Sequence, residues 1–408
     1  MSAPRRIAFY LSCFPGGGLE RVTLTLMSEL LARGYQVDLV LERAQGDFLR
    51  YVPPAVRQIT LQDGGKWTAW RHLTRVRPID GLIQALAMLF GTHRHIPLKR
   101  LDSLVDYLRT HKPDILIAAA GRIPFLALWA KSIAGVSTAF VIAEHSTFSQ
   151  RLDAFKADTA KHARLLFRKR LMRRLYRHAD AVFAVSAGVA DDIATVSGLA
   201  RDTISVLYNP VVSPHLLRRA AEPPAFEWAC EGGPPLILAV GRLAPEKGFD
   251  TLVEAFARLR EAGRDARLLI LGEGPERGRL EALIDEHGLA PFVALPGWAD
   301  NPPSCLRASR LFVLSSRVEG LPVTLIEALA CGTRIVATDC RSGPREILED
   351  GQHGELVPVD DIEALAAAMM RVLNEPDAGM EARRRRAGDF GVEPAVDAYE
   401  QLIERVCR

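Results

Sequence analysis

Residues 315–330 read SSRVEGLPVTLIEALA and mark the place where a short strand meets a helix. The four residues before them, Leu311–Leu314, form an apolar run typical of strands buried on both faces of a parallel sheet. Gly320 lets the backbone approach a ligand closely, and Pro322 suits the first turn of a helix that begins near Val323. The N–H groups and the dipole at such a helix start attract an anion such as a diphosphate. The stretch therefore predicts an α/β unit with an anion site at the carboxyl end of its strand.

Two acids in the same stretch point to a sugar or ribose ligand. Glu319 lies just before the predicted helix and Glu327 lies on it, so both can point toward the strand ends. A carboxylate can accept two hydrogen bonds from a vicinal diol, which makes it a usual partner of ribose hydroxyls. A helix cap beside a solvated acid is the alternative. Because strand, glycine, proline and both acids coincide here, we favour a nucleotide site.

Short apolar runs alternate with helical patterns along the rest of the chain. The expected strands lie at residues 7–12, 37–41, 115–119, 139–143, 181–186 and 204–208 in the first half, and at residues 236–240, 267–271, 293–295, 311–314, 334–337 and 355–357 in the second. Helices are expected between and after them, for example at residues 20–33, 101–111, 249–262, 275–287 and 362–373. This alternation predicts two doubly wound α/β domains with ligand sites at the carboxyl ends of their strands, and hence a site between the domains.

Prolines and glycines interrupt every periodicity between residues 210 and 233, which predicts a domain boundary there. We expect an N-terminal domain over residues 1–210 and a C-terminal domain over residues 211–408, with a last helix at about residues 393–408. The least regular stretch, residues 51–100, is expected only to elaborate the first domain. It is rich in aromatic, histidine and basic residues, among them Trp67, Trp70, His72, His93 and His95.

Composition and charge exclude several classes of protein. The 408 residues are 48% hydrophobic and 25% charged, as in soluble globular chains, and the net charge of +3 gives no basic field for nucleic acid. No stretch reaches the roughly 20 apolar residues of a membrane-spanning helix, so a cytoplasmic or peripheral membrane protein is expected. The apolar run after Arg6 lacks a cleavage site and is expected to be a first strand. Scattered cysteines without metal-ligand spacing predict buried thiols in a reducing compartment: Cys13, Cys230, Cys305, Cys331, Cys340 and Cys407.

The spacing of Glu319 and Glu327, with seven residues between them, resembles the E-x7-E signature of retaining glycosyltransferases of the GT-B fold, glycosyltransferase family four in particular. The resemblance covers nearly the whole chain, strongly over residues 236–376 and sparsely over residues 1–210. It implies an α/β architecture of two Rossmann-like doubly wound domains that face each other across a cleft. The nucleotide-diphosphate sugar would bind mainly to the second domain and the acceptor mainly to the first. The last helix would return to pack on the N-terminal domain.

The resemblance assigns two cations of the segment VGRLAPEKGFDTLVEAF to the donor diphosphate. In the family an Arg and a Lys clamp the phosphates, which fits Arg242 and Lys247. The chemistry agrees, since Arg offers a planar fork of donors and Lys a compact charge; surface cations near a turn are the alternative. Gly272 of the next βα unit and Gly297 of a loop near the base resemble further donor-binding positions. The spacing after Gly272 does not fit a dinucleotide fingerprint.

Two features of the first domain resemble other parts of the family's site. PGGGLER, residues 15–21, is similar to a glycine-rich loop that approaches the donor phosphates and the acceptor, where the N–H groups of Gly17 and Gly18 would serve. A tight turn without a ligand is the alternative. His145 follows a strand end and looks like the family's active-site His near the transferred sugar, although a lone His is more often structural.

The implied reaction retains the anomeric configuration, and the departing phosphate oxygen helps to deprotonate the acceptor hydroxyl. Glu319 would hold the transferred sugar, Glu327 the ribose, and the amides of Gly320 and Leu321 the leaving group. The sequence has no Asp-x-Asp motif, so we expect no essential metal and no cofactor. The resulting site comprises His145, Glu319, Arg242 and Lys247 for catalysis, and Gly17, Gly18, Arg242, Lys247, Gly272, Gly297, Glu319, Gly320, Leu321 and Glu327 for the donor.

Residues 161–177 predict a second kind of partner. They carry eight Lys or Arg residues interleaved with apolar residues, and no acid. The spacing is helical with one apolar face, which would suit an anionic membrane surface on the inner side of the cell membrane. A domain helix with a buried apolar stripe and solvated charges is an equal alternative. By family analogy, a UDP-sugar and a glycan or lipid-linked glycan of cell-surface polysaccharide synthesis are the favoured substrates.

Several other functions are compatible with parts of this pattern. A nucleotide-sugar epimerase shares the fold but would need acids poised to move a sugar proton. A non-catalytic scaffold would not need the charged residues named above. A phosphorylase would need a lysine context for pyridoxal phosphate, and a nicotinamide oxidoreductase would need a glycine fingerprint and a ribose acid, none of which we find. The sugar, the acceptor, the linkage and the oligomeric state stay open.

Overall fold

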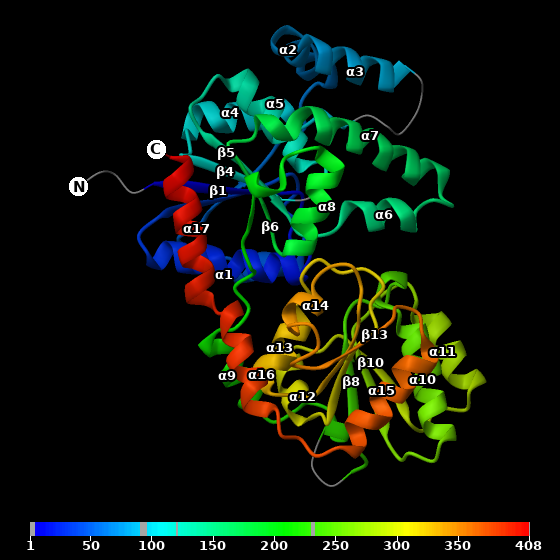
Figure 1. Cartoon of the computed structure of the whole chain (residues 1–408). Coiled ribbons are helices and arrows are strands. Elements are labelled where there is room, and N and C mark those ends of the chain that lie inside the picture. Colours follow the sequence, from blue (N-terminus) through cyan, green and yellow to red (C-terminus); the bar gives the residue numbers. More distant parts are fainter. Residues whose placement is uncertain (1–4, 90–95, 120, 230–232, 408) are drawn as a thin grey trace. The chain divides into compact units, whose positions relative to one another are not determined.

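The computed structural model describes residues 5–89, 96–119, 121–229 and 233–407. The chain forms two compact units, of which the first comprises Met1–Tyr208 with Ala395–Arg408 and the second Asn209–Pro394 (Figure 1). Of the residues singled out above, His93, His95 and Cys230 lie outside the described part. None of the described helices is long and apolar enough to cross a membrane.

The first unit contains a seven-stranded parallel sheet in the order β3-β2-β1-β4-β5-β6-β7. Its central strands are almost entirely buried, which is why they read as continuous apolar runs in the sequence. The edge strand β3 alternates between half-buried and exposed residues, and the sequence did not predict it for that reason. The strands are β1 (Arg6–Leu11), β2 (Gln36–Leu41), β3 (Arg57–Thr60), β4 (Ile115–Ala119), β5 (Ala139–Glu144), β6 (Ala181–Ala184) and β7 (Ile204–Val206).

Helices connect these strands and cover the sheet (Figure 1). The hairpin of α2 and α3 occupies much of the stretch for which the sequence predicted no regular structure. The helices are α1 (Gly18–Ala32), α2 (Lys66–Val76), α3 (Pro78–Leu89), α4 (Leu101–His111), α5 (Ile123–Ala134), α6 (Phe148–Ala154), α7 (Thr159–Leu175), α8 (Ala187–Ser197) and α17 (Val392–Val406).

Most of α17 belongs to the first unit, although it follows the second unit in the chain. Its Tyr399 is buried, and the ring centroid lies 5.2 Å from that of Phe183 in β6. Its Asp397 forms an ion pair of 2.7 Å with Arg33, the residue that caps α1. Apolar burial and charge thus both attach this helix to the first unit.

The second unit contains a six-stranded parallel sheet in the order β10-β9-β8-β11-β12-β13. Its core joins Ile270 of β9 with Phe256, Leu365 and Met369 of the covering helices, all fully buried. The strands are β8 (Leu236–Val240), β9 (Arg267–Leu271), β10 (Val293–Gly297), β11 (Leu311–Leu314), β12 (Ile335–Thr338) and β13 (Glu355–Val357). The helices are α9 (Pro214–Ala221), α10 (Phe249–Glu261), α11 (Arg277–Glu286), α12 (Pro302–Ala308), α13 (Val323–Cys331), α14 (Pro344–Ile347), α15 (Ile362–Asn374) and α16 (Met380–Ala387).

The cysteines differ in part from the prediction. Cys305, Cys331 and Cys340 are buried free thiols, as expected for core positions. Cys13 and Cys407 are only partly buried, because the first lies in the loop after β1 and the second just beyond α17. Burial raises the pKa of the Cys340 thiol to about 12, so this thiol stays protonated at neutral pH.

In each sheet the strand order reverses at one point. The chain moves outward in opposite directions from β1 and β4 in the first sheet, and from β8 and β11 in the second. Loops that follow such a pair of strands separate and leave a crevice at the carboxyl edge, where open α/β sheets bind ligands. In the second unit these loops are residues 241–248 and 315–322.

Gly272, directly after β9, packs against the loop that follows β8. A Cβ atom added to Gly272 would lie 1.9 Å from the carbonyl oxygen of Gly241, and the residue has a φ of +145°. Side-chain-bearing residues rarely adopt this backbone conformation. The need for glycine at this position therefore comes from backbone packing within the unit.

The substitution Gly272→Ala is expected to lower the free energy of unfolding by about 2–4 kcal/mol, because it combines an unfavourable φ with a steric clash. Gly278→Ala in α11 is the matched control, since an added Cβ there meets nothing within 4 Å. It should change the free energy of unfolding by less than about 1 kcal/mol. Urea unfolding followed by circular dichroism measures both variants. Equal stability of the Gly272 variant and the wild type would show that the loop can move away from Gly241.

Candidate functional site

The two loops at the switch point of the second sheet bring a predicted pair of residues together. The Nζ atom of Lys247 lies 2.6 Å from Oε1 of Glu319. The hydroxyl of Ser316 donates a second hydrogen bond to the same oxygen at 2.7 Å. Glu319 is buried and Lys247 is partly exposed. The contact places an ammonium group, held by a carboxylate, at the edge where a ligand is expected.

Arg242 occupies the same loop but has a different partner. Its guanidinium forms an ion pair with Glu246, four residues later, and its side chain is 65% exposed. Burial would raise the pKa of Glu246, but hydrogen bonds from its own backbone amide and from Arg242, together with the charge of Arg242, lower it. Exposed ion pairs of this kind contribute only about 0–1 kcal/mol. The Arg242 guanidinium can therefore exchange its carboxylate for another anion at little cost.

The ends of β8, β9 and β10 meet at this edge. The amide of Gly272 donates to the carbonyl of Gly297 at 2.8 Å, and the amide of Gly241 donates to that of Leu271 at 2.9 Å. Gly272 and Gly297, both predicted to bind the donor, therefore lie side by side. The structure explains the glycine at position 272 by its approach to Gly241, without requiring a ligand.

The start of α13 carries the other predicted donor contacts. Pro322 precedes the first turn, and its side chain makes no capping hydrogen bond. Gly320 and Leu321 are buried, and Ser342 donates a hydrogen bond of 2.8 Å to the carbonyl of Gly320. Glu327 lies in the second turn with only 1% of its surface exposed. Glu327 thus lies deeper in the unit than Glu319.

Glu327 has an electrostatic effect on the next turn of the helix. Burial, and then the charge of Glu327, raise the pKa of the Cys331 thiol to about 12. This thiol therefore remains protonated at neutral pH and behaves as an apolar core group.

In the first unit, the predicted glycines lie at the start of α1. Gly17 is the capping residue and has extended backbone, and Gly18 is the first residue of the helix. The carboxyl group of Glu20 accepts hydrogen bonds from the amides of Gly17 and Glu20. Burial nevertheless raises the pKa of Glu20. Glu20 thus occupies the helix start that was predicted to approach phosphates. The sequence did not indicate this contact.

His145 follows β5 and lies in apolar surroundings. Its ring packs edge-on to Phe183 with centroids 6.5 Å apart, and it lines a cavity of about 20 Å³ with Phe9, Leu11 and Tyr399 among others. Burial lowers the pKa of His145 to about 4. The imidazole is therefore neutral at pH 7 and can exchange hydrogen bonds but carries no charge.

A buried acid that the sequence analysis did not single out precedes this histidine. Glu144 ends β5 and accepts a hydrogen bond from the hydroxyl of Tyr176. Burial raises the pKa of Glu144 to about 7 despite this hydrogen bond. The sequence could have indicated this residue, because Glu144 directly follows an apolar run typical of a buried strand. A carboxyl group in such a place must find a hydrogen-bond partner or take up a proton.

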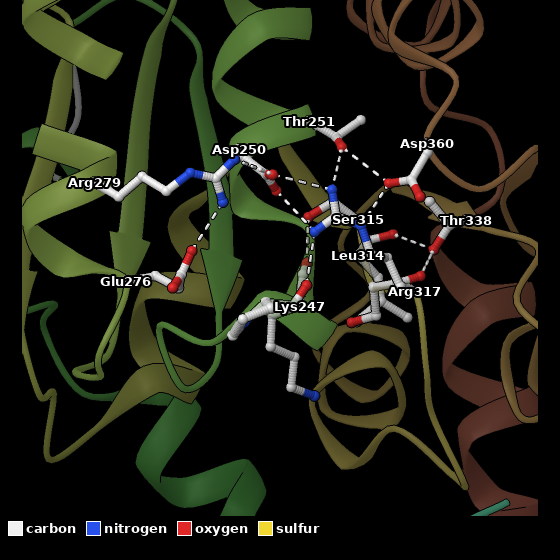
Figure 2. A network of polar contacts seen from close by, with 12 residues as sticks. Lys247, Asp250, Thr251, Glu276, Arg279, Leu314, Ser315, Arg317, Thr338 and Asp360 are labelled. Carbon is white, nitrogen blue, oxygen red and sulfur yellow. Dashed lines mark hydrogen bonds and ion pairs between the residues drawn. The ribbon is translucent and has the colours of Figure 1, made fainter. Parts of the chain in front are cut away.

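Arg317 is a further residue whose role the sequence did not indicate (Figure 2). Its guanidinium pairs with both oxygens of Asp250, at 2.9 and 3.1 Å, and with Asp360 at 2.6 Å. It also donates to the hydroxyl of Thr251 at 3.1 Å and to the carbonyl of Pro245 at 2.6 Å. Hydrogen bonds and charge from Arg317 lower the pKa of Asp250, although burial alone would raise it.

These contacts connect the two loops of the switch point. The amide of Arg317 donates to the carbonyl of Glu246 at 2.8 Å. The hydroxyl of Ser315 donates to the carbonyl of Lys247 at 2.9 Å (Figure 2). Gly248 makes this approach possible, because a Cβ there would lie 2.2 Å from the carbonyl oxygen of Ser315. Arg317 therefore positions the backbone that carries Lys247 relative to the backbone that carries Glu319.

Among the described residues, no group of three or more His, Cys, Asp or Glu side chains is arranged to hold a metal ion. Cationic side chains near the switch point of the second sheet include Arg242, Lys247 and Arg317.

The substitution Arg317→Met is expected to lower the free energy of unfolding by about 2–4 kcal/mol, because it leaves Asp250 and Asp360 without their shared cation. Arg279→Met is the matched control: Arg279 also contacts Asp250, at 3.0 Å, but its side chain is 61% exposed. The control should lose no more than about 1 kcal/mol. Thermal and urea unfolding measure the difference. Equal losses in the two variants would contradict a positioning role for Arg317.

The lowered pKa of His145 predicts a dependence of stability on pH. Below pH 6.5 this histidine takes up a proton in the unfolded chain, whereas in the folded chain it does so only near pH 4. The free energy of unfolding therefore decreases as the pH falls from 6.5 towards 4. When the pH is lowered from 7.5 to 5, the free energy of unfolding of the wild type should decrease by about 2 kcal/mol more than that of His145→Gln. His287→Gln, at the exposed end of α11, controls for loss of a histidine. Parallel pH profiles of the wild type and the His145 variant would refute the assignment.

Comparison with known proteins identifies the family. Residues 225–389 match the family described as Glycosyl transferases group 1, and residues 16–213 match the one described as Glycosyltransferase Family 4. The chain is 30% identical over 91% of its length to N-acetylgalactosamine-N,N'-diacetylbacillosaminyl-diphospho-undecaprenol 4-alpha-N-acetylgalactosaminyltransferase of Campylobacter jejuni, of which it covers 91%. It is 27% identical over 95% of its length to the lipopolysaccharide core biosynthesis glycosyltransferase LpsE of Rhizobium meliloti, of which it covers 96%.

A solved structure agrees with this at the level of the fold. The Anabaena protein Alr3699/HepE, crystallised in complex with UDP-glucose, aligns with a TM-score of 0.71 and 19% identity, over 98% of this chain and 99% of its own. The two parallel α/β sheets described above are thus those of a GT-B fold. Together with the relatives, they show that the chain is a glycosyltransferase and belongs to glycosyltransferase family four.

Proposed function

We propose that this glycosyltransferase moves a sugar from a UDP-sugar to a glycan or lipid-linked glycan acceptor, with retention of the anomeric configuration. The observation that carries the proposal is the contact of Lys247 with Glu319 at the switch point of the second sheet. The contact supports the proposal, because it joins Lys247, our candidate cation for the diphosphate, to Glu319, our candidate acid for the sugar hydroxyls. The relatives are named for lipid-linked and lipopolysaccharide-core acceptors, which supports cell-surface glycan synthesis at the inner face of the membrane.

The donor would bind mainly to the second unit. Lys247 and the exposed Arg242 exchange their carboxylate partners for the diphosphate of the donor. Glu319, released from Lys247, then accepts hydrogen bonds from hydroxyls of the transferred sugar, and Glu327 holds the ribose. UDP is favoured as the nucleotide because the structural relative Alr3699/HepE was crystallised with UDP-glucose.

The reaction breaks the bond between the anomeric carbon and the diphosphate oxygen and forms one between that carbon and the acceptor oxygen. Both occur on the same face of the sugar, and the acceptor proton passes to the departing phosphate oxygen. Arg242, Lys247 and the amides at Gly320 and Leu321 stabilise the charge on the leaving group. With these groups available, we propose that no metal ion or cofactor is essential. The neutral imidazole of His145 would contact the transferred sugar, and Gly17 and Gly18 would approach the substrates from the first unit.

A thermal-shift screen against UDP, GDP, ADP and their common sugars, with and without EDTA, tests the donor site. A ligand that binds only the folded chain raises the melting temperature by mass action. We expect a clear shift with UDP or a UDP-sugar that EDTA leaves unchanged. A shift only with a metal ion would contradict metal independence, and no shift with any nucleotide would favour a non-catalytic scaffold.

The variants Lys247→Ala and Glu319→Gln are expected to lower kcat/KM for sugar transfer by roughly 100-fold or more, the usual effect of removing one group that stabilises the transition state. Lys99→Ala is the matched control, because Lys99 forms an exposed ion pair with Asp63 in the first unit. Proton NMR of the product gives its anomeric configuration. An inverted product would contradict the mechanism, and exchange of the sugar's stereochemistry without an acceptor would favour an epimerase.

A further inference from the structure

The structure first shows where the apolar residues of the basic segment 161–177 lie. In α7, which is described throughout, Leu165, Leu171, Met172 and Leu175 are buried and belong to the core of the first unit. Leu166 is the exposed large apolar side chain of this helix. α7 thus offers basic charge to a membrane but little apolar surface to insert. A membrane anchor has to be sought elsewhere in the unit.

The helix α3 exposes apolar side chains and buries polar ones, the reverse of an ordinary surface helix. Ile79, Leu82 and Leu86, spaced three and four residues apart on one face, are 55%, 58% and 44% exposed. The positions that face the protein interior hold polar or small residues: Asp80, Gly81, Gln84 and Ala87. A helix on a soluble core normally buries its apolar face and exposes its polar face. The apolar face of α3 is turned outward instead.

Specific contacts fix this orientation. The fully buried carboxylate of Asp80 accepts hydrogen bonds from Arg77 at 2.5 Å and from Arg174 of α7 at 2.6 Å. Gln84, also fully buried, accepts a hydrogen bond of 3.0 Å from the amide of Ile96. Rotating α3 to bury its leucines would expel this carboxylate from its cations and leave the arginines uncompensated. The chain therefore maintains the exposed apolar face by buried polar contacts.

The neighbouring helix α2 holds α3 in place and adds to the apolar surface. The indole of Trp70 donates to the carbonyl of Gly81 at 2.9 Å, and a Cβ on Gly81 would lie 2.3 Å from the hydroxyl of Thr74. Trp67 and Val76 of α2 are exposed. Half of the ten exposed large apolar side chains in the described part fall between residues 67 and 86. In Figure 1 the two helices lie side by side. We call Ile79, Leu82 and Leu86, which share the exposed face of α3, the hairpin patch.

The charges on this hairpin have one sign. Lys66, Arg71 and Arg75 are exposed, and the sole acid of residues 66–89 is the buried Asp80. Arg71 and Arg75 also line a hollow along α2 together with His72. His72 contacts Asp102 of α4 at 3.0 Å. Asp63, which precedes α2, pairs with Lys99 and Arg100. Apolar side chains next to uncompensated basic ones match the interface of an anionic bilayer, with its acyl chains beneath phosphate groups.

We propose that the α2–α3 hairpin is the membrane-docking surface of this glycosyltransferase, with the hairpin patch inserted into the interface of a bilayer that contains anionic lipids. This deepens the proposed function, since it rests on an acceptor that is anchored in the membrane. The basic residues of α2 would contact lipid phosphates. The basic surface of α7, linked to α3 by Arg174 and Asp80, would add to the attraction.

Charge favours a bilayer over a second copy of the chain as the occupant. A two-fold interface through the hairpin would place the same patch on both sides. Lys66, Arg71 and Arg75 would then face an identical basic set, without exposed acids on α2 or α3 to pair with them. An anionic lipid surface supplies the missing negative charge at about 1 kcal/mol for each basic residue near it.

Flotation with lipid vesicles tests the proposal on the full chain, without donor or acceptor. We expect binding to vesicles of phosphatidylethanolamine and phosphatidylglycerol at 3:1, and at least tenfold weaker binding to pure phosphatidylcholine. The triple variant Ile79→Ser/Leu82→Ser/Leu86→Ser should bind the anionic vesicles at least tenfold more weakly than the wild type. Leu217→Ser/Met380→Ser, which alters exposed apolar residues of the second unit, is the matched control and should bind as the wild type does.

Two further measurements separate the contributions. Arg71→Gln/Arg75→Gln should weaken binding to anionic vesicles by about tenfold and leave binding to phosphatidylcholine unchanged. Leu82→Glu, a single change at an exposed site, should abolish binding while the thermal unfolding curve stays that of the wild type. Wild-type binding by the triple variant, or no binding of the wild type to either vesicle, would overturn the proposal. A concentration-dependent dimer in sedimentation velocity that the triple variant disperses would also overturn it, in favour of a second copy. Because no donor or acceptor is present, failure of sugar transfer would not affect these outcomes.

Discussion

The parallel pairing of β8 with β11 is the constraint on which the candidate site of the second unit depends. These two strands are neighbours in the sheet although the chain between them builds β9 and β10. The loops that follow them must therefore diverge, and their ends bring Lys247 and Glu319 into contact. Arg317 also connects the two segments. It lies in the loop after β11, and its guanidinium contacts Pro245 in the loop after β8 and Asp250 at the start of α10. A cation and an acid that are distant in sequence are thus placed together by strand order.

The two units use buried charge differently. In the second unit, Glu319 and Asp250 near the switch point are paired with Lys247 and Arg317, and these pairs fix the loops. In the first unit, Glu144 and His145 occupy apolar surroundings, where burial raises the pKa of the acid to about 7 and lowers that of the imidazole to about 4. Both groups are pushed toward their neutral forms. The first unit thereby offers polar groups that can exchange hydrogen bonds without carrying a full charge.

How well the sequence predicts an element of this structure depends on how completely that element is buried in the core. Strands such as β5 and β11 are covered on both faces, so their apolar runs are continuous and recognisable. The edge strand β3 is half-exposed, and α3 turns its apolar face outward. In both cases the positions of the apolar residues do not show which residues are buried in the core. The same is true of the site. Glu319 and Lys247 could be named from motifs, whereas the partners of Arg317 lie 67 and 43 residues away and are joined to it only by the fold.

The path of the chain through α17 has a consequence for folding. Asn209–Pro394 form a contiguous segment, whereas the first unit is assembled from two segments that flank it. Tyr399 and Asp397, which pack on Phe183 and Arg33, reach the first unit from beyond the second unit in the chain. Until α17 has docked, the sheet of the first unit lacks one covering helix, and the apolar surface around Phe183 is open to the solvent or to a chaperone. Folding of the first unit is therefore completed only by a segment that follows the second unit in the chain.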